Sequence, residues 1–298
     1  MTIQQLQYAL AVYRAGSISA AAAGLFIAQP NLSGVIRSLE EELGYPIFIR
    51  TSRGVQPTEQ GMEALRQAAQ IIDCHEKMCQ VGNALPRRRL RIGGISYNPV
   101  CDAFAQLCKE YQDEKDLEMA FYTDDLAVSL EKLMLSEIDI AVALRSPDDA
   151  DRLEKLCRQK NLKLTHIVDV PMVLRIGPRH PLYNAPEIRL SDFEQYAMVD
   201  YNDKVFLEYP SLSALLHIDR DRIVTVSDRA LKNRLISETA MYSIGCKLPP
   251  RSNERFGFRC IPLDDLHYCL FVLERSDSQR GELTVKSLDL LERYLEDL

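Results

Sequence analysis

Apolar side chains at the start of the chain recur at helical spacing. They fall every three or four residues and predict one amphipathic helix: Ile3, Leu6, Leu10 and Tyr13. Gly16 is expected to end this helix, because glycine readily takes the left-handed conformation that follows a helix. The small residues of Ala20–Ala23 predict a second helix that another helix can approach closely, with Ser19 as its N-cap.

A third helix with a polar outer face is predicted next. Its core-facing positions share the helical spacing: Leu32, Val35, Ile36, Leu39 and Leu43. It is expected to begin near Gln29-Pro30, because proline is tolerated in a first turn, and to stop at Gly44. Ser52-Arg53-Gly54 then predicts the tip of a short hairpin. Three helices followed by a hairpin form the order of a winged helix-turn-helix, which indicates DNA binding.

A long helix is expected to start at Thr58 and to run to about Ala84. Its apolar positions follow steps of three and four, interrupted by Glu76: Met62, Leu65, Ala69, Ile72 and Cys79. Such a stripe forms either a coiled-coil seam between two subunits or a face packed on its own domain. Pro86 is expected to end the helix, with Arg87–Arg89 as a basic hinge.

The pattern then changes to strands that alternate with helices. The expected strands are Leu90–Ile95, Leu117–Tyr122, Ile138–Leu144, Thr165–Ile176, Ala197–Asp200, Ile223–Val226 and Cys269–Leu273. The expected helices open at Asn98-Pro99, span Leu126–Leu135, end within Ser237–Tyr242 and span Leu283–Leu295. This order predicts an α/β fold with crossover connections.

Charge is distributed unevenly between the two parts. The net charge of −7 argues by itself against a nucleic-acid binder. Residues 1–90, however, carry nine Lys/Arg and seven Asp/Glu, a balance of +2, whereas the remaining residues carry −9. This asymmetry fits a small DNA-binding module attached to an acidic sensor. The module holds few cations, so few phosphate contacts are expected.

Cysteine spacing and hydropathy indicate the compartment. The eight cysteines form neither a CxxC pair nor a Cys/His set at zinc spacing, so no metal ligands are predicted and reduced thiols in the cytosol are expected. A redox sensor is the alternative, and Cys246 would be the first thiol to test. No segment has the pattern of a signal peptide or the apolar length of a membrane span, which predicts a cytoplasmic protein without membrane contact.

The N-terminal segment resembles the LysR-type transcriptional regulators. The resemblance rests on Leu6, Tyr8, Val12, Gly16, Ser17, Ile18, Ala22, Ala23, Leu25, Gln29-Pro30, Leu32-Ser33, Ile36, Leu39-Glu40, Glu42-Leu43-Gly44, Pro46, Phe48, Arg50, Arg53-Gly54, Thr58 and Gly61. Weaker marks follow at Leu90–Gly93, Asp139–Val142 and Gly245–Pro249. The sequence departs from the pattern at Ala28, where the family usually has serine, and at Gly34, where it often has a basic or polar residue.

The resemblance implies three regions and several partners. Residues 1–58 are expected to form the winged helix-turn-helix, 59–90 the linker (dimerisation) helix and hinge, and 91–298 an effector-binding domain similar to periplasmic ligand-binding proteins. Its lobes are expected at 91–164 with 269–298, and at 165–268. The expected partners are double-stranded promoter DNA, a small-molecule effector, further copies of this chain as a homodimer or homotetramer, and RNA polymerase.

The polar face of the third helix is the candidate DNA-reading surface. Gln29 is placed to read an adenine edge, and Ser33 and Arg37 are placed to bind phosphates. Arg53 at the wing tip is placed for a minor groove or a phosphate. The full candidate set is Gln29, Pro30, Asn31, Ser33, Arg37, Arg50, Arg53 and Thr58. The alternative is an ordinary solvated helix face.

Effector ligands are expected at the carboxyl ends of the strands. Those positions are Ser96, Tyr97, Thr123, Asp124, Arg145, Tyr201, Asn202, Ser227, Asp228 and Cys246. Ser96 before a helix N-terminus and Arg145 suit an anion, whereas Asp124 and Asp228 suit a cationic group. Taken singly, each residue can equally be a helix cap or a loop residue.

The chain carries none of the enzyme motifs searched for, namely GxGxxG, GxxxxGK[ST], GxSxG and HExxH, so neither an enzyme nor a bound cofactor is predicted. We therefore predict a LysR-type regulator whose promoter binding responds to an effector. The alternatives are a thiol-based redox-sensing regulator and a degenerate regulator that acts through protein partners.

Overall fold

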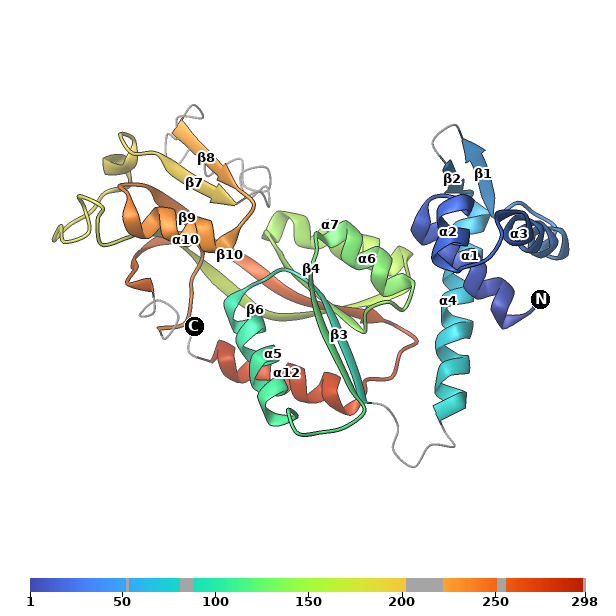
Figure 1. Ribbon diagram of the computed structural model, residues 1–298. Helices are drawn as coiled ribbons and strands as arrows, with labels where there is room; N and C mark the ends of the chain where they lie inside the picture. Colours follow the sequence, from blue (N-terminus) through green and yellow to red (C-terminus); the bar gives the residue numbers. More distant parts are fainter. Residues whose placement is uncertain (52–53, 81–87, 202–221, 251–255, 297–298) are drawn as a thin grey trace. The chain divides into compact units, whose positions relative to one another are not determined.

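The computed structural model describes residues 1–51, 54–80, 88–201, 222–250 and 256–296. These residues group into two compact units (Figure 1). The first contains Met1–Arg88 together with Asp116–Glu118 and Leu130–Asp139, and the second contains the remaining residues from Arg89 onward. The domain and lobe boundaries expected from the sequence stay predictions.

The N-terminal unit contains the expected winged helix-turn-helix. Its elements are α1 (Ile3–Ala15), α2 (Ile18–Gly24), α3 (Gln29–Leu43), the antiparallel hairpin β1 (Phe48–Thr51) and β2 (Gly54–Pro57), and α4 (Glu59–Gln80). Gly16 and Gly44 end α1 and α3 in the left-handed conformation, as predicted. Arg53 at the wing tip and residues 81–87, which include the predicted helix end at Pro86, lie outside the described residues.

The predicted N-cap of the second helix is wrong by two positions. Ser17, not Ser19, caps α2, because its side chain accepts a hydrogen bond from the backbone N–H of Ala20. The helix starts earlier because Ile18 is an apolar anchor that is buried in the core.

One core holds this unit together, with α4 supplying part of it. Leu32 and Leu39 of α3 are buried against Leu6 and Leu10 of α1. Leu65, Ala68 and Ala69 of α4 belong to the same core. The first half of the long helix therefore packs on its own domain, which was one of the two roles predicted for its apolar stripe. Farther along α4, Met78 is exposed.

The C-terminal region forms one eight-stranded mixed sheet in the order β4-β3-β5-β10-β6-β9-β7-β8. Its strands are β3 (Arg88–Gly94), β4 (Leu117–Thr123), β5 (Ile140–Arg145), β6 (Leu162–Ile176), β7 (Met198–Tyr201), β8 (Ile223–Val226), β9 (Tyr242–Cys246) and β10 (Arg259–Arg275). The two long strands β6 and β10 pair antiparallel along their length, with an irregularity between Pro262 and His267.

The helices of this region are α5 (Asn98–Glu110), α6 (Leu126–Met134), α7 (Pro147–Gln159), α10 (Arg229–Glu238) and α12 (Glu282–Leu295). Figure 1 shows α5 and α12 packed side by side, in agreement with their many residue contacts. The predicted fold class is confirmed: a winged helix-turn-helix is followed along the chain by an α/β region.

Three details differ from the sequence prediction. The helix α7, capped by Ser146, was not predicted. The last strand begins ten residues earlier than the predicted Cys269, since its first part pairs with β6 at Arg259–Pro262. Tyr242 starts the strand β9 rather than ending a helix, because its backbone pairs with Ile176 in the sheet.

Among the described residues, no single helix is both long enough and apolar enough to span a membrane. The helices α2 and α3 meet the length and hydropathy criteria only when they are taken together, and the angle between them is 114°.

Candidate nucleic-acid interface and ligand pocket

The N-terminal end of α3 is an exposed polar surface. Gln29, Pro30, Asn31 and Arg37 are exposed, and Ser33 is half-buried. Ala28 occupies the N-cap position without a side-chain hydrogen bond, and no acidic residue lies in the first turn. The partial positive charge of the helix N-terminus is therefore not neutralised locally, which favours a phosphate there.

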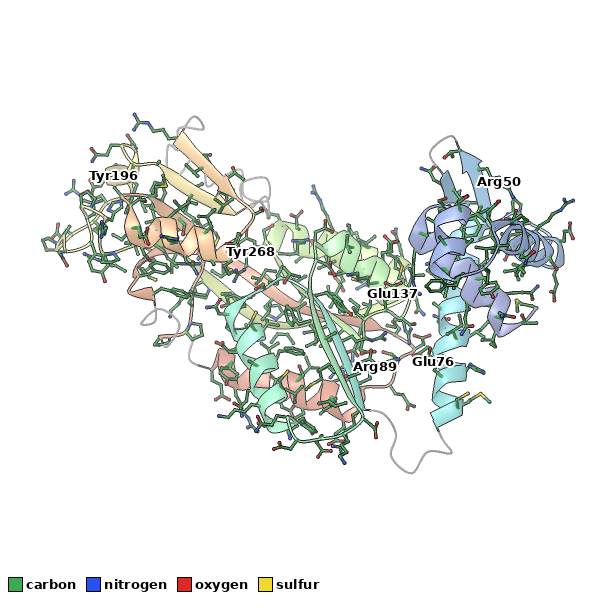
Figure 2. The ribbon with its side chains drawn as sticks, in the orientation of Figure 1. Arg50, Glu76, Arg89, Glu137, Tyr196 and Tyr268 are labelled. Atoms are coloured by element: carbon green, nitrogen blue, oxygen red, sulfur yellow. The ribbon has the colours of Figure 1, made fainter. Side chains whose placement is uncertain are left out.

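Arg50 and Arg37 extend this surface from two elements. Arg50 of β1, labelled in Figure 2, donates a hydrogen bond from Nη2 to Ser33 Oγ over 2.9 Å and so joins the wing to α3. Arg37 Nε lies 3.0 Å from Glu41 Oε1, and both side chains are largely exposed. Such exposed ion pairs contribute little to the stability of a protein, so Arg37 can leave Glu41 and bind a DNA phosphate with little loss of folding free energy.

Thr58 has a positioning role in the structure. Its hydroxyl donates to Pro46 O and accepts from the backbone N–H of Gly61, each over 2.8 Å. The predicted N-cap of α4 is thus confirmed, and its predicted contact with DNA stays a prediction.

Glu40 holds the start of the wing, a role that the sequence analysis missed. Its Oε1 accepts hydrogen bonds from Ile47 N at 2.8 Å and Phe48 N at 3.0 Å. The sequence does contain a signal, since a carboxylate in the last turns of a helix is unfavourable to the dipole unless it has a partner.

A pocket lies within the C-terminal unit. Its volume is about 130 Å³ between the described residues. It is lined by Ile95, Tyr97, Asn98, Leu144, Arg145, Arg175, Arg229, Lys232, Asn233, Ile244, Gly245, Cys246, Leu248, Phe256 and Tyr268. Three predicted effector residues, Tyr97, Arg145 and Cys246, therefore line one cavity, as the rule about strand ends predicts.

Five of the other predicted effector residues, all of them described, do not line this cavity: Ser96, Thr123, Asp124, Ser227 and Asp228. Ser96 Oγ lies 3.5 Å from Cys101 Sγ. Thr123 and Ser227 are exposed, and the backbone N–H of Asp124 bonds to Gly94 O over 3.1 Å. Asp228 caps α10 through Leu231 N. These are turn and cap positions, the alternative that the sequence left open; the side chain of Tyr201 and all of Asn202 lie outside the described residues.

Arg175 of β6 is the unusual member of the pocket, and the sequence analysis missed it. Its side chain is 9% exposed, and Nη2 donates to Cys246 O over 2.8 Å. Burial lowers the pKa of Arg175, and the nearby Arg229 cation acts in the same direction. The sequence contains a signal for this residue, because Arg175 is a cation within the apolar run Val170–Ile176. A charge in a buried strand needs a partner, so such a position is a candidate binding residue.

Tyr97 and Arg229 attach two helices to this pocket. Tyr97 is buried and donates its hydroxyl to Lys247 O over 2.8 Å, and burial raises its pKa. Arg229 at the start of α10 donates to Asn98 Oδ1 over 3.3 Å. Tyr268 of β10, labelled in Figure 2, completes the aromatic part of the wall.

A second polar cluster joins β6 to β10. His166 Nε2 lies 2.8 Å from Asp169 Oδ1, and the possible ligand atoms of His166, Asp169 and Cys269 lie within 4.8 Å of one another. The hydrogen bond with His166 lowers the pKa of Asp169, and burial raises the pKa of Cys269 to about 11. The thiol is thus a protonated donor at neutral pH. All eight cysteines lie among the described residues, and none of them forms a disulfide.

Comparisons with known proteins agree with both parts of the structure. Residues 3–62 match the family model "Bacterial regulatory helix-turn-helix protein, lysR family". The regulator BudR of Raoultella terrigena is 26% identical over 275 residues, covering 91% of this chain and 87% of BudR. The regulator AbaB of Streptomyces antibioticus is 30% identical over 184 residues, 60% of this chain. This match and that with the nitrogen assimilation regulatory protein of Klebsiella aerogenes each span 57% of the relative.

Solved structures share the fold of the whole chain. ArgP of Mycobacterium tuberculosis aligns with a TM-score of 0.69 at 16% identity, covering 99% of this chain and 97% of ArgP. Full-length OxyR of Pseudomonas aeruginosa aligns with a TM-score of 0.63 at 16% identity, covering 99% and 95%. Residues 3–62 therefore match the lysR family of bacterial helix-turn-helix proteins, and the chain as a whole is similar in sequence to the regulator BudR and shares the fold of full-length LysR-type structures.

Proposed function

We propose that this chain is a cytoplasmic transcriptional regulator, and not an enzyme, whose binding to promoter DNA is modulated by a small molecule in the Arg175 pocket. The observation that carries the DNA-binding part is the exposed N-terminal end of α3, where Gln29 and Arg37 lie on a helix whose terminus has no neutralising carboxylate. That geometry matches a recognition helix, whose first residues contact base edges in the major groove.

The residues of this surface divide into two roles. Gln29 reads bases, because an amide can bond both N6 and N7 of adenine. Arg37 and Arg50 grip phosphates and fix the docking angle. Gly34 leaves open space on the same face, so shape contributes to recognition where a side chain is absent.

Regulation requires at least two copies of the chain and a ligand whose affinity differs between two arrangements of the assembly. A homodimer or homotetramer presents two recognition helices to two half-sites, and α4 is the element that connects each module to the rest of its chain. The ligand must bind one arrangement of the assembly more tightly than the other, or it cannot shift DNA binding. The changed assembly then alters access of RNA polymerase to the promoter.

We expect Gln29→Ala to weaken binding to the specific site about 10- to 100-fold and to leave binding to random DNA unchanged, since a bidentate base contact contributes ~1–3 kcal/mol of discrimination. Arg37→Ala should weaken both and should lower the slope of log K against log salt by about one. Fluorescence anisotropy of the full-length protein on fragments flanking its own coding sequence, at two salt concentrations, measures both quantities.

Two matched controls are available. Gln67 on α4 and Arg152 on α7 are exposed and belong neither to α3 nor to the wing, and their alanine variants should bind DNA as the wild type does. Equal losses for specific and random DNA in Gln29→Ala would remove its base-reading role. Wild-type binding without selectivity or salt slope would instead support a regulator that acts only through protein partners.

A further inference from the structure

We propose that the molecule bound in the pocket of the C-terminal unit is a small organic anion, whose carboxylate or phosphate pairs with the guanidinium of Arg175. The inference rests on the proposed function only in treating this pocket as the effector site.

Among the residues that the structure describes, Arg175 has no counter-ion for its buried charge. Nη2 bonds to a neutral carbonyl, and Nε, also buried, has no hydrogen-bond partner. Within the described part of the chain, no carboxylate forms an ion pair with it. An arginine stays charged in proteins, so it retains the full cost of leaving water. A ligand carboxylate or phosphate would supply the missing partner in a bidentate arrangement.

The surrounding charges favour the same ligand. Arg145, Arg229 and Lys232 also line the pocket, and none of the described lining residues is an aspartate or glutamate. The helix α5 begins at the pocket with Tyr97 as its N-cap and Asn98 in its first turn, without a side-chain cap and without an acidic residue in that turn. The positive end of this helix adds to the field of the four cations. A cationic effector, the alternative that Asp124 and Asp228 suggested, is disfavoured by the cations among the described lining residues.

Gly245 leaves the space that the guanidinium of Arg175 occupies. A Cβ atom on Gly245 would lie 2.5 Å from Arg175 Nη2. The glycine in β9 thus leaves room for the arginine to lie flat across the neighbouring strand. A larger residue would push the guanidinium out of its place, so the anchor and the glycine form one feature.

The volume and the walls define the rest of the ligand. A cavity of about 130 Å³ is close in size to an engineered cavity of ~150 Å³ that holds benzene, so the part of the ligand enclosed by the described residues has roughly six non-hydrogen atoms. Ile95, Leu144, Ile244 and Phe256 supply apolar walls. The ligand class is therefore a small organic acid with one compact apolar body and an anionic end.

The first test needs no knowledge of the ligand. Arg175→Met removes an unpaired buried charge and should raise the melting temperature of the ligand-free full-length protein by about 2–4 °C. The matched control is Arg259→Met, because Arg259 Nη1 donates to the carbonyls of Leu182, Tyr183 and Ala185 and is therefore a structural donor. That variant should melt lower. If Arg175→Met also melts lower, Arg175 is structural and the proposal fails.

The second test uses defined probes on the full-length protein. Butanoate, benzoate, succinate and inorganic phosphate, at 10 mM with matched ionic strength, are compared by melting temperature and calorimetry with the neutral butanamide and benzamide. We expect at least one anion to bind and its neutral counterpart not to bind. Preference for the organic acids over phosphate identifies a carboxylate effector, and the reverse identifies a phosphate ester.

The variants make the second result specific. Arg175→Met should reduce affinity for the bound anion at least tenfold, and Arg175→Lys should recover part of it, because lysine keeps the charge but not the bidentate geometry. Failure of every anion to bind the wild type, or equal binding of the amides, would overturn the proposal. DNA binding is measured without ligand in the anisotropy experiment, so a failure here is distinguishable from a failure of the proposed function.

Discussion

Replacing Gly61 by alanine is expected to unfold the winged helix-turn-helix module and to abolish DNA binding. An added Cβ atom would lie 2.0 Å from Ile47 O and 2.8 Å from Ile47 Cα, which are backbone atoms that cannot rotate away. Ile47 O also accepts the hydrogen bond of Thr58 N, so the collision falls on the contact that seats α4. We expect a loss of about 3 kcal/mol or more, at the upper end of overpacking effects.

The control is the other interior helical glycine of this module. A Cβ atom on Gly34 of α3 meets nothing within 4 Å. Gly34→Ala should stabilise the module by ~0.5–1 kcal/mol, because alanine has the higher helix propensity. Calorimetry of the full chain, with anisotropy on DNA, compares the two variants. A Gly61→Ala protein that melts and binds DNA as the wild type does would show that α4 can shift away from Ile47 without cost.

Local signals explain why most of the N-terminal module could be predicted. Gly16, Gly44 and Thr58 act through their own turn of helix, so the residue type alone gives the element boundary. Ser17 and Ser19 are both good N-caps, and local rules cannot choose between them. The choice is made by burial of Ile18, a tertiary effect.

The pocket could be predicted only in part because its anchor is non-local. Tyr97, Arg145 and Cys246 follow or end strands, where the rule for α/β sheets looks for ligands. Arg175 lies inside a long strand and reaches the pocket because β6 pairs with β9, with Met172 opposite Cys246 and Arg175 opposite Ser243. That register joins residues about 70 positions apart in the sequence, and no short pattern encodes it.

Gly94→Ala is expected to destabilise the α/β unit and to remove ligand binding, while the DNA-binding module keeps its fold. Gly94 ends β3 at φ +122°, and an added Cβ atom would lie 2.0 Å from Val142 O and 2.9 Å from Val142 N. The substitution thus combines an unfavourable backbone conformation, ~1–3 kcal/mol, with a collision against a neighbouring strand, ~1–3 kcal/mol. The next residues along the chain, Ile95, Tyr97 and Asn98, line the pocket, so displacement of β3 moves its wall.

Gly94→Ala tests whether the α/β unit can lose stability and ligand binding while the DNA-binding module keeps its fold. The core of α1 to α4 consists of side chains from that module and Leu135, and none of them belongs to β3, so a melting transition assigned to that module should not shift, and random-DNA affinity should be retained. Gly281→Ser is the control, because Gly281 is the N-cap of α12 with open space around it and serine can cap the helix. It should melt at or slightly above the wild-type temperature. The added Cβ atom can be accommodated only if β3 or the backbone at Val142 moves. If Gly94→Ala changed neither the melting of the α/β unit nor the binding of the anionic probe, the position of β3 would not determine the shape of the pocket wall.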